Sequence, residues 1–300
     1  LCGQDDTRLL FRARDTLLGR PEFYSIVQCR ACGLVYLSPR PSPQAMARHY
    51  PADYFNELGG GGVTTTAVRR VLKNVLYRLT GGMARIIESL PPGRVLDVGC
   101  GDGRYLAFFR DLGWETYGTD PSPVAVERAR ARGLDVADPG ELGEARLPER
   151  RFDLVVLRYT LENMHHPAVT LREVRRVLKD DGKVFVSAPS VSSPVARVFR
   201  QYCAYVEAPR HLYFFSPATL PALLARTGFR VVRLARVAWP SLVRDVVNRL
   251  SGGRYRGLLA RRWVSRGVWL AGVPASLLLA YVGLNRGNLE VVAEKNVRLA

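Results

Sequence analysis

Short apolar runs alternate with amphipathic stretches through the middle of the chain. The apolar runs are residues 95–98, 116–119, 134–137, 154–157 and 184–187, and the stretches 104–112, 123–132 and 167–178 carry apolar positions at helical spacing. Strands that alternate with helices predict a parallel sheet covered by helices on both faces. Two later apolar runs, 230–237 and 289–294, predict two further strands.

The first part of the chain has a different pattern. Two short strand-like runs, 24–27 and 34–37, flank the tight turn Cys29-Arg30-Ala31-Cys32-Gly33. A proline-rich exit follows, and prolines end the second run because they cannot donate to a sheet ladder. The predicted organisation is a small module over 1–45, a linker with a helix over 46–93, and a main domain over 94–300 with an insert over 238–288.

Composition narrows the class of protein. The chain has 300 residues, of which 47% are hydrophobic and 24% are charged, as is typical of globular proteins. Its formal net charge is +17, which reflects either a general preference for arginine or a surface that attracts phosphates. Five cysteines are too few, and odd in number, for a secreted disulfide scaffold. No signal peptide opens the chain, so we expect a cytoplasmic protein.

A glycine-rich loop follows the first strand of the alternation. Gly99, Gly101 and Gly103 recur at every second residue, whereas a dinucleotide fold needs Gly-x-Gly-x-x-Gly for its pyrophosphate. Asp97 lies just before this loop, where it would repel a pyrophosphate but could hold an ammonium group. Asp120 ends the next strand and is placed to accept two ribose hydroxyls. This arrangement favours S-adenosylmethionine (SAM); an ordinary strand–helix turn with an incidental acid is the alternative.

These segments carry a family resemblance. Residues 95–103 resemble the first motif of class I SAM-dependent methyltransferases, 117–123 the second, 152–158 the fourth strand and 178–183 the turn into the fifth. The resemblance implies a Rossmann-like α/β fold with a seven-stranded sheet, one strand of it antiparallel. It also implies that SAM lies across the carboxyl ends of the first strands, with its adenine near Leu142. Many relatives have Leu-Glu-His after the fourth strand, where this chain has Leu161-Glu162-Asn163.

The cysteines of the first module suggest a metal. Cys29-x-x-Cys32-Gly resembles half of a zinc ribbon, and Cys2-Gly3 resembles the end of another half whose first cysteine we expect before Leu1. Zinc takes four thiolates or imidazoles in a tetrahedron. A degenerate ribbon without metal is the alternative. A ribbon before this core resembles sugar C-methyltransferases and their bacterial relatives, and also an rRNA guanine methyltransferase type; the proline-rich exit favours the first group.

The acceptor side offers a histidine. His211 lies in Ala208-Pro209-Arg210-His211-Leu212-Tyr213, after the fifth strand, and similar segments recur in the bacterial relatives. Its ordinary pKa suits a general base, although a structural histidine bonded to the backbone fits the same pattern. Arg210 is expected either to meet an acidic group of the substrate or to face solvent.

The insert over 238–288 joins an arginine-rich run to an apolar stretch. Residues 267–284 have about the minimum length of a membrane span, but proline and glycines interrupt them. The strands on either side of the insert are expected to pair in one sheet, which argues against a crossing. A peripheral contact at the inner membrane face, or a helical lid, fits better.

The sequence therefore predicts SAM-dependent methyl transfer to a small-molecule acceptor, such as a sugar, a quinone or a lipid-linked intermediate. An RNA methyltransferase is the first alternative, supported by the ribbon and the positive charge, although nucleic acid is the less expected partner. A non-catalytic SAM-binding module at a membrane surface is the second.

Overall fold

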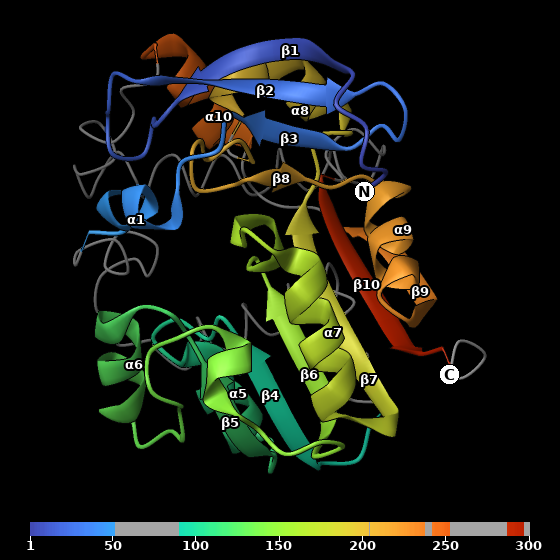
Figure 1. Cartoon of the computed structure of the whole chain (residues 1–300). Helices are drawn as coiled ribbons and strands as arrows, with labels where there is room; N and C mark the ends of the chain where they lie inside the picture. Colours follow the sequence, from blue (N-terminus) through green and yellow to red (C-terminus); the bar gives the residue numbers. More distant parts are fainter. Residues whose placement is uncertain (52–89, 204, 238–241, 253–286, 297–300) are drawn as a thin grey trace.

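The computed structural model describes residues 1–51, 90–203, 205–237, 242–252 and 287–296 (Figure 1). Within them the chain forms two sheets, one above the other in this view. The helix expected over 67–89 and the apolar stretch 267–284 lie outside the described residues.

The larger sheet has the alternation that the sequence predicts. Its strands are β4 (Arg94–Val98), β5 (Glu115–Thr119), β6 (Phe152–Arg158), β7 (Leu178–Pro189), β9 (Phe229–Val237) and β10 (Asn288–Lys295), in the order β5-β4-β6-β7-β10-β9. The first four are parallel, whereas β10 runs antiparallel to both of its neighbours. The predicted pairing of the strands on either side of the insert is therefore confirmed, as is the single antiparallel strand.

The prediction of seven strands is wrong for the described residues, where the sheet has six. The run 134–137 forms only an isolated parallel bridge between Gly118 and Val136. Two backbone hydrogen bonds hold it, from Gly118 N to Asp135 O at 3.0 Å and from Ala137 N to Gly118 O at 3.0 Å. Pro139 then follows, and because proline has no N–H and restricts the residue before it, the ladder cannot continue.

Helices cover both faces of this sheet. They include α5 (Arg104–Asp111), α6 (Pro123–Arg130), α7 (Pro167–Val177) and α9 (Thr219–Arg226). Successive side chains of β4 enter different cores: Leu96 packs with Val155 of β6, whereas Val95 packs with Leu154. A sheet buried on both faces needs apolar residues at consecutive positions, which explains the unbroken apolar runs in these strands.

The smaller sheet joins the N-terminal module to a segment that follows β7. Its strands are β1 (Thr7–Arg14), β2 (Phe23–Cys29), β3 (Val35–Ser38) and β8 (Tyr213–Phe214), in the order β1-β2-β3-β8. β2 and β3 form the predicted hairpin. β8 pairs antiparallel with β3, so the segment that contains His211 is held against the N-terminal sheet.

Short helices accompany this second sheet. They are α1 (Pro43–Met46), α8 (Pro194–Phe199) and α10 (Leu242–Leu250). In Figure 1, α8 and α10 overlap the strands of this sheet, and α1 lies below them to the left. A separate apolar core lies here, and it includes Ile26 and Leu37 from the N-terminal strands and Phe214 from β8. Among the described residues, no helix is both long enough and apolar enough to cross a bilayer.

Candidate cofactor and acceptor site

The glycine loop between β4 and α5 folds tightly onto the ends of β5 and β6. Gly99 and Cys100 donate backbone hydrogen bonds to Thr119 O, at 2.7 and 3.0 Å. Gly99, Gly101 and Gly103 have φ values of 74°, 55° and 77°, in the left-handed region that favours glycine. A Cβ on Gly99 would also clash with Thr160. The alternate glycines are therefore required by the turn itself.

Asp120 holds this loop in place. One oxygen of its carboxylate accepts a hydrogen bond from Gly101 N at 2.9 Å, and the other accepts from Ser122 N at 2.9 Å. Burial raises the pKa of Asp120, and these two hydrogen bonds oppose the rise. The carboxylate is thus fixed beside the loop, and its contact with ribose hydroxyls stays a prediction.

Asp97 lies beneath the same loop. Its side chain is 3% exposed, and burial raises its pKa to about 7, although the positive charge of Arg158 opposes the rise. The negative charge of Asp120 adds to the rise, so the two carboxylates sense each other. A buried acid that titrates near neutrality gains strongly from an added cation. This environment fits the ammonium group that the sequence assigns to Asp97.

Leu142 is buried at 2% exposure in the 3-10 turn η2 (Leu142–Ala145). The loop that leads into this turn is tied to Asp120, because Gly140 N donates to Asp120 O at 3.2 Å. Leu142 therefore belongs to the loop that lies next to Asp120. Its contact with an adenine ring stays a prediction.

Arg158 and Tyr105 are missed by the sequence reasoning. The Arg158 guanidinium lies 3.4 Å from the centroid of the Tyr105 ring and also contacts the Tyr105 hydroxyl. Tyr105 lies in the first turn of α5, and Arg158 is the last residue of β6, so the pair lies beside the cofactor loop. A charged residue at the carboxyl end of an otherwise apolar strand is the signal that could have revealed it.

His211 is nearly buried, at 8% exposure. Its Nδ1 lies 3.0 Å from Tyr205 O, and a carbonyl can only accept, so Nδ1 carries the hydrogen. A neutral ring fixed in this way has its unprotonated nitrogen at Nε2, the form that a general base needs. The ring also packs edge-on against Phe214, at 6.3 Å between centroids.

Arg210 neither faces solvent nor is free to meet a substrate. It is 1% exposed, and two of its nitrogens bind the two carboxylate oxygens of Asp15 at 2.8 and 2.9 Å. His49 Nδ1 lies 3.3 Å from the same carboxylate. Burial alone would raise the pKa of Asp15, but hydrogen bonds and charge from Arg210 outweigh it and lower the pKa. This network ties β1 to the segment that carries His211.

Glu162 is a second residue that the sequence reasoning overlooked. It is 0% exposed, and among the described residues neither oxygen of its carboxyl group has a hydrogen-bond partner. Burial raises its pKa to about 8, and the nearby charge of Glu207 adds to the rise. The residue that departs from the family pattern is Asn163, whose side-chain amide donates to Tyr159 O at 3.1 Å.

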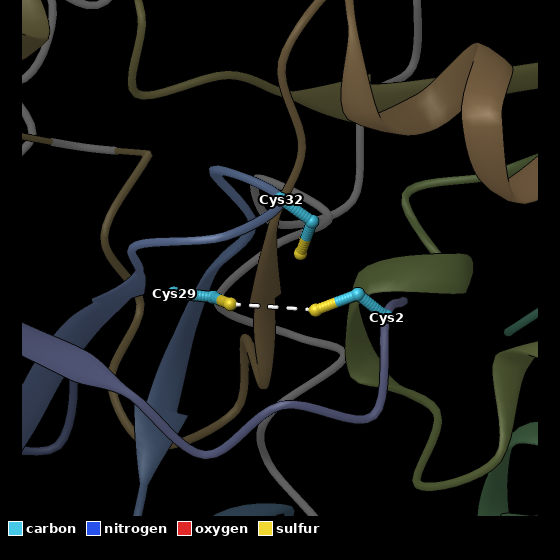
Figure 2. A group of neighbouring side chains, drawn as sticks. All are labelled: Cys2, Cys29 and Cys32. Carbon is cyan, nitrogen blue, oxygen red and sulfur yellow. Dashed lines mark hydrogen bonds between the residues drawn. The ribbon is translucent and has the colours of Figure 1, made fainter.

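The three cysteines of the N-terminal module converge, as Figure 2 shows. Cys2 comes from the start of the chain, and Cys29 and Cys32 come from the end of β2 and the turn that follows it. Their sulfur atoms all lie within 4.8 Å of one another, and Cys2 Sγ is 3.6 Å from Cys29 Sγ. Tetrahedral zinc with Zn–S bonds of about 2.3 Å separates its sulfurs by about 3.8 Å. The observed spacing therefore fits three ligands of one zinc ion.

Comparison with known proteins supports the resemblance seen in the sequence. An uncharacterised protein of Mycobacterium tuberculosis (strain H37Rv) is 36% identical over 161 residues, which are 53% of this chain and 54% of that protein. The chain thus matches about half the length of this relative. A ubiquinone biosynthesis O-methyltransferase of Azorhizobium caulinodans is 26% identical over 191 residues, covering 57% of this chain and 72% of the relative.

Solved structures share the fold. The PH0226 protein of Pyrococcus horikoshii superposes with a TM-score of 0.52 at 15% identity, over 81% of this chain and 98% of the other. The cyclase SpnF superposes with a TM-score of 0.51 at 21% identity, over 86% and 98%. A family model described as a methyltransferase domain matches residues 71–234, which are more than half of the sequence. The chain therefore belongs to the methyltransferase-domain family.

Proposed function

We propose that this protein is a SAM-dependent methyltransferase that acts on a small-molecule acceptor. The observation that carries the proposal is the pair of buried carboxylates, Asp97 and Asp120, on either side of a tight glycine loop at the ends of β4 and β5. A pyrophosphate would meet two negative charges here. A ligand with an ammonium group and two ribose hydroxyls would instead satisfy both acids.

Each predicted site residue then has a role. Asp97 holds the ammonium, Asp120 accepts hydrogen bonds from the ribose hydroxyls, and Leu142 borders the adenine. When bound, the cofactor supplies a methyl group on a positively charged sulfur. His211 Nε2 accepts the proton that the acceptor loses as the new bond forms. The hydrogen bond from Nδ1 to Tyr205 O orients the ring and leaves the acceptor lone pair on Nε2.

The acceptor class rests on two kinds of support. The Azorhizobium relative is named for methylation in ubiquinone synthesis, which favours a quinone-type acceptor. The resemblance to sugar C-methyltransferases favours a sugar. An RNA acceptor is supported by the net charge of +17 but opposed by the buried acids around the site. A lipid-linked acceptor would suit a peripheral membrane contact through 238–288, most of which lies outside the described residues.

Calorimetric titration with S-adenosylhomocysteine tests the cofactor directly. We expect micromolar binding to the wild type and its loss in Asp120→Ala, because that carboxylate receives the ribose. Asp111→Ala is the matched control, since Asp111 ends α5 with a side chain that is 73% exposed and should bind normally. A folded wild-type protein that binds no S-adenosylhomocysteine would overturn the proposal.

We further propose that Cys2, Cys29 and Cys32 bind Zn²⁺ through their thiolates. Hydrogen bonds from the backbone at Gln4 and from the other two cysteines lower the pKa of Cys2 to about 7, which favours the thiolate that zinc needs. The ion would hold the start of the chain to the turn between β2 and β3. Its role would be structural, because these cysteines belong to the N-terminal module rather than to the cofactor loop.

A further inference from the structure

Glu162 stands between the two halves of the proposed site. It lies in the 3-10 turn η3 (Leu161–Asn163) that follows β6. On one side, Thr160 packs so closely on Gly99 that only glycine fits there. On the other, the backbone oxygen of Glu162 accepts a hydrogen bond from Leu212 N at 2.8 Å, next to His211. The turn therefore joins the cofactor loop to the acceptor segment.

Burial of the Glu162 carboxyl group without a hydrogen-bond partner is energetically unfavourable. Among the described residues neither oxygen has a hydrogen-bond partner, and the side chain is 0% exposed. Buried polar groups in folded proteins are almost always paired, and an unpaired one calls for a specific explanation. Packing alone does not require an acid here, since a leucine of similar size would leave no polar atom unpaired. A bound ligand that donates a hydrogen bond to the carboxylate would explain why an acid lies at this position.

Tyr50 is influenced by the charge of Glu162 and also by that of Asp120. Burial raises the pKa of Tyr50; the charge of Arg210 opposes the rise, and the charges of Glu207, Glu162 and Asp120 add to it. One half-buried side chain is thus within electrostatic reach of both Glu162 and the acid assigned to the ribose.

We propose that the Glu162 carboxylate binds a hydroxyl group of the acceptor, and that the acceptor is an uncharged, hydroxyl-bearing small molecule. This inference rests on the proposed methyltransferase function and narrows its substrate class. Glu207 adds negative charge at Glu162, Asp120 adds it at the neighbouring Tyr50, and Arg210, whose positive charge also reaches Tyr50, is paired with Asp15. An acceptor that brought a phosphate to this place would be repelled, whereas phenols, quinols and sugar hydroxyls donate hydrogen bonds without charge.

Binding of such a hydroxyl is linked to proton release. The free carboxyl has a pKa of about 8, so at pH 7 it is mostly protonated. Among the described residues, Glu207 and Tyr50 interact with it electrostatically, and His211 precedes Leu212, whose N–H donates to the Glu162 carbonyl. β7 ends in the uncharged residues Ser187, Ala188 and Pro189, and β8 brings Tyr213, whose hydroxyl donates to His165 O. A donated hydroxyl stabilises the ionised form, lowers the pKa and expels a proton.

Calorimetry on the complex with S-adenosylhomocysteine tests this. Catechol and methyl α-D-glucopyranoside are titrated separately at pH 7, in two buffers of different ionisation enthalpy, so that the protons released are counted. We expect proton release with at least one probe in the wild type. In Glu162→Gln the release should vanish and affinity fall by about 10-fold or more, as for a lost hydrogen bond to a charged group. Binding of catechol would indicate a phenolic acceptor, and binding of methyl α-D-glucopyranoside would indicate a sugar.

Two further variants make the result decisive. Glu127→Gln makes the same chemical change at an exposed position of α6 and should behave as the wild type. Glu162→Asp keeps a carboxylate and should retain part of the proton release even if Glu162→Gln folds poorly. Loss of S-adenosylhomocysteine binding itself would instead count against the proposed function. If the cofactor product binds but neither probe does, or if Glu162→Gln releases the same protons, the inference is wrong.

Discussion

A single buried acid, Glu162, sets a pH dependence of stability that its replacement should remove. Its pKa is about 8 in the folded chain, against 4.5 for an ordinary glutamic acid, so the folded state favours the protonated form. The stabilising contribution is therefore complete below about pH 4.5 and is lost as the pH rises through about 8. Glutamine imitates the protonated acid at every pH.

We expect Glu162→Gln to be as stable as the wild type near pH 4.5 and more stable at pH 9, by on the order of a few kcal/mol. Urea unfolding of both proteins at the two pH values measures the difference. Other titrating groups cancel in the comparison, because they are common to both chains. Equal stabilities at pH 9 would show that the carboxyl is not held in an unfavourable state.

At the same scale, Asp97 should make cofactor affinity depend on pH. Because its pKa is about 7 in the free protein, Asp97 must lose its proton before it can form an ion pair with an ammonium group. Affinity for S-adenosylhomocysteine should thus rise from about pH 6 to about pH 8, by at most about tenfold per pH unit. In Asp97→Asn we expect weaker binding with a flat profile, measured by calorimetry. A slope that survives in Asp97→Asn would assign the titration to another group, such as Asp120.

Among the elements, the contact between β1 and the segment before β8 depends on one buried ion pair. Asp15 and Arg210 are 0% and 1% exposed, so breaking the pair leaves an uncompensated charge. We expect Asp15→Asn or Arg210→Met to lower the free energy of unfolding by about 3–5 kcal/mol, and the double variant Asp15→Leu/Arg210→Met to cost much less than the sum. Chemical denaturation measures all three.

The matched control for this pair is Arg94–Glu115, whose side chains are 49% and 59% exposed. Glu115→Gln should change stability by no more than about 1 kcal/mol. If the buried and exposed pairs cost the same, Asp15 and Arg210 do not act as proposed. Because His211 follows Arg210 directly, the same variants should also loosen the acceptor segment.

The elements that the sequence predicts best are those buried on both faces. β4 and β6 are continuous apolar runs because each side chain enters one of two cores, and this pattern is visible without a structure. β1 was missed because only Ala13 of its eight residues is buried, so it carries no clear alternation. β8 has two residues, and its pairing with β3 spans much of the chain, which no local pattern records.

The residues of the candidate site also fall into those that the sequence predicts and those that it does not. Asp97, Asp120 and the loop glycines could be predicted because their role follows from local spacing around one turn. Glu162 and the partnership of Arg210 with Asp15 could not, since both depend on which distant segment covers them. The predicted solvent or substrate role of Arg210 was wrong for this reason: an exposed arginine and a buried one look alike in sequence.

Across the whole molecule, charge is distributed unevenly between surface and site. The chain carries a formal charge of +17, yet the side chains buried around the proposed site include Asp97, Asp120 and Glu162. A positive surface attracts phosphates in general, but the acids inside favour a cationic cofactor and an uncharged acceptor. Weak binding to nucleic acid that falls steeply with salt is therefore compatible with a small-molecule enzyme and does not by itself indicate an RNA substrate.

Zinc at the N-terminal cysteines would stabilise the pairing between the N-terminal hairpin and β8. Cys29 ends β2, and the turn after it leads into β3, which pairs with β8 and so supports the segment of His211. We expect the wild type to contain close to one zinc per chain by mass spectrometry of metals, and Cys32→Ser to contain much less. Removing the ion with a chelator should lower the melting temperature, because the ion links the start of the chain to the hairpin.

Cys203→Ala provides the control, since Cys203 is 1% exposed and packs in the core beneath the same sheet rather than in the cysteine cluster. Its zinc content should equal that of the wild type even if its stability falls slightly. A wild type that holds no zinc after purification in zinc-containing buffer, or a Cys32→Ser variant that holds as much as the wild type, would contradict the metal site. In that case the hairpin is held by its apolar contacts alone, with Ile26 and Leu37 as the residues whose truncation should then unfold the module.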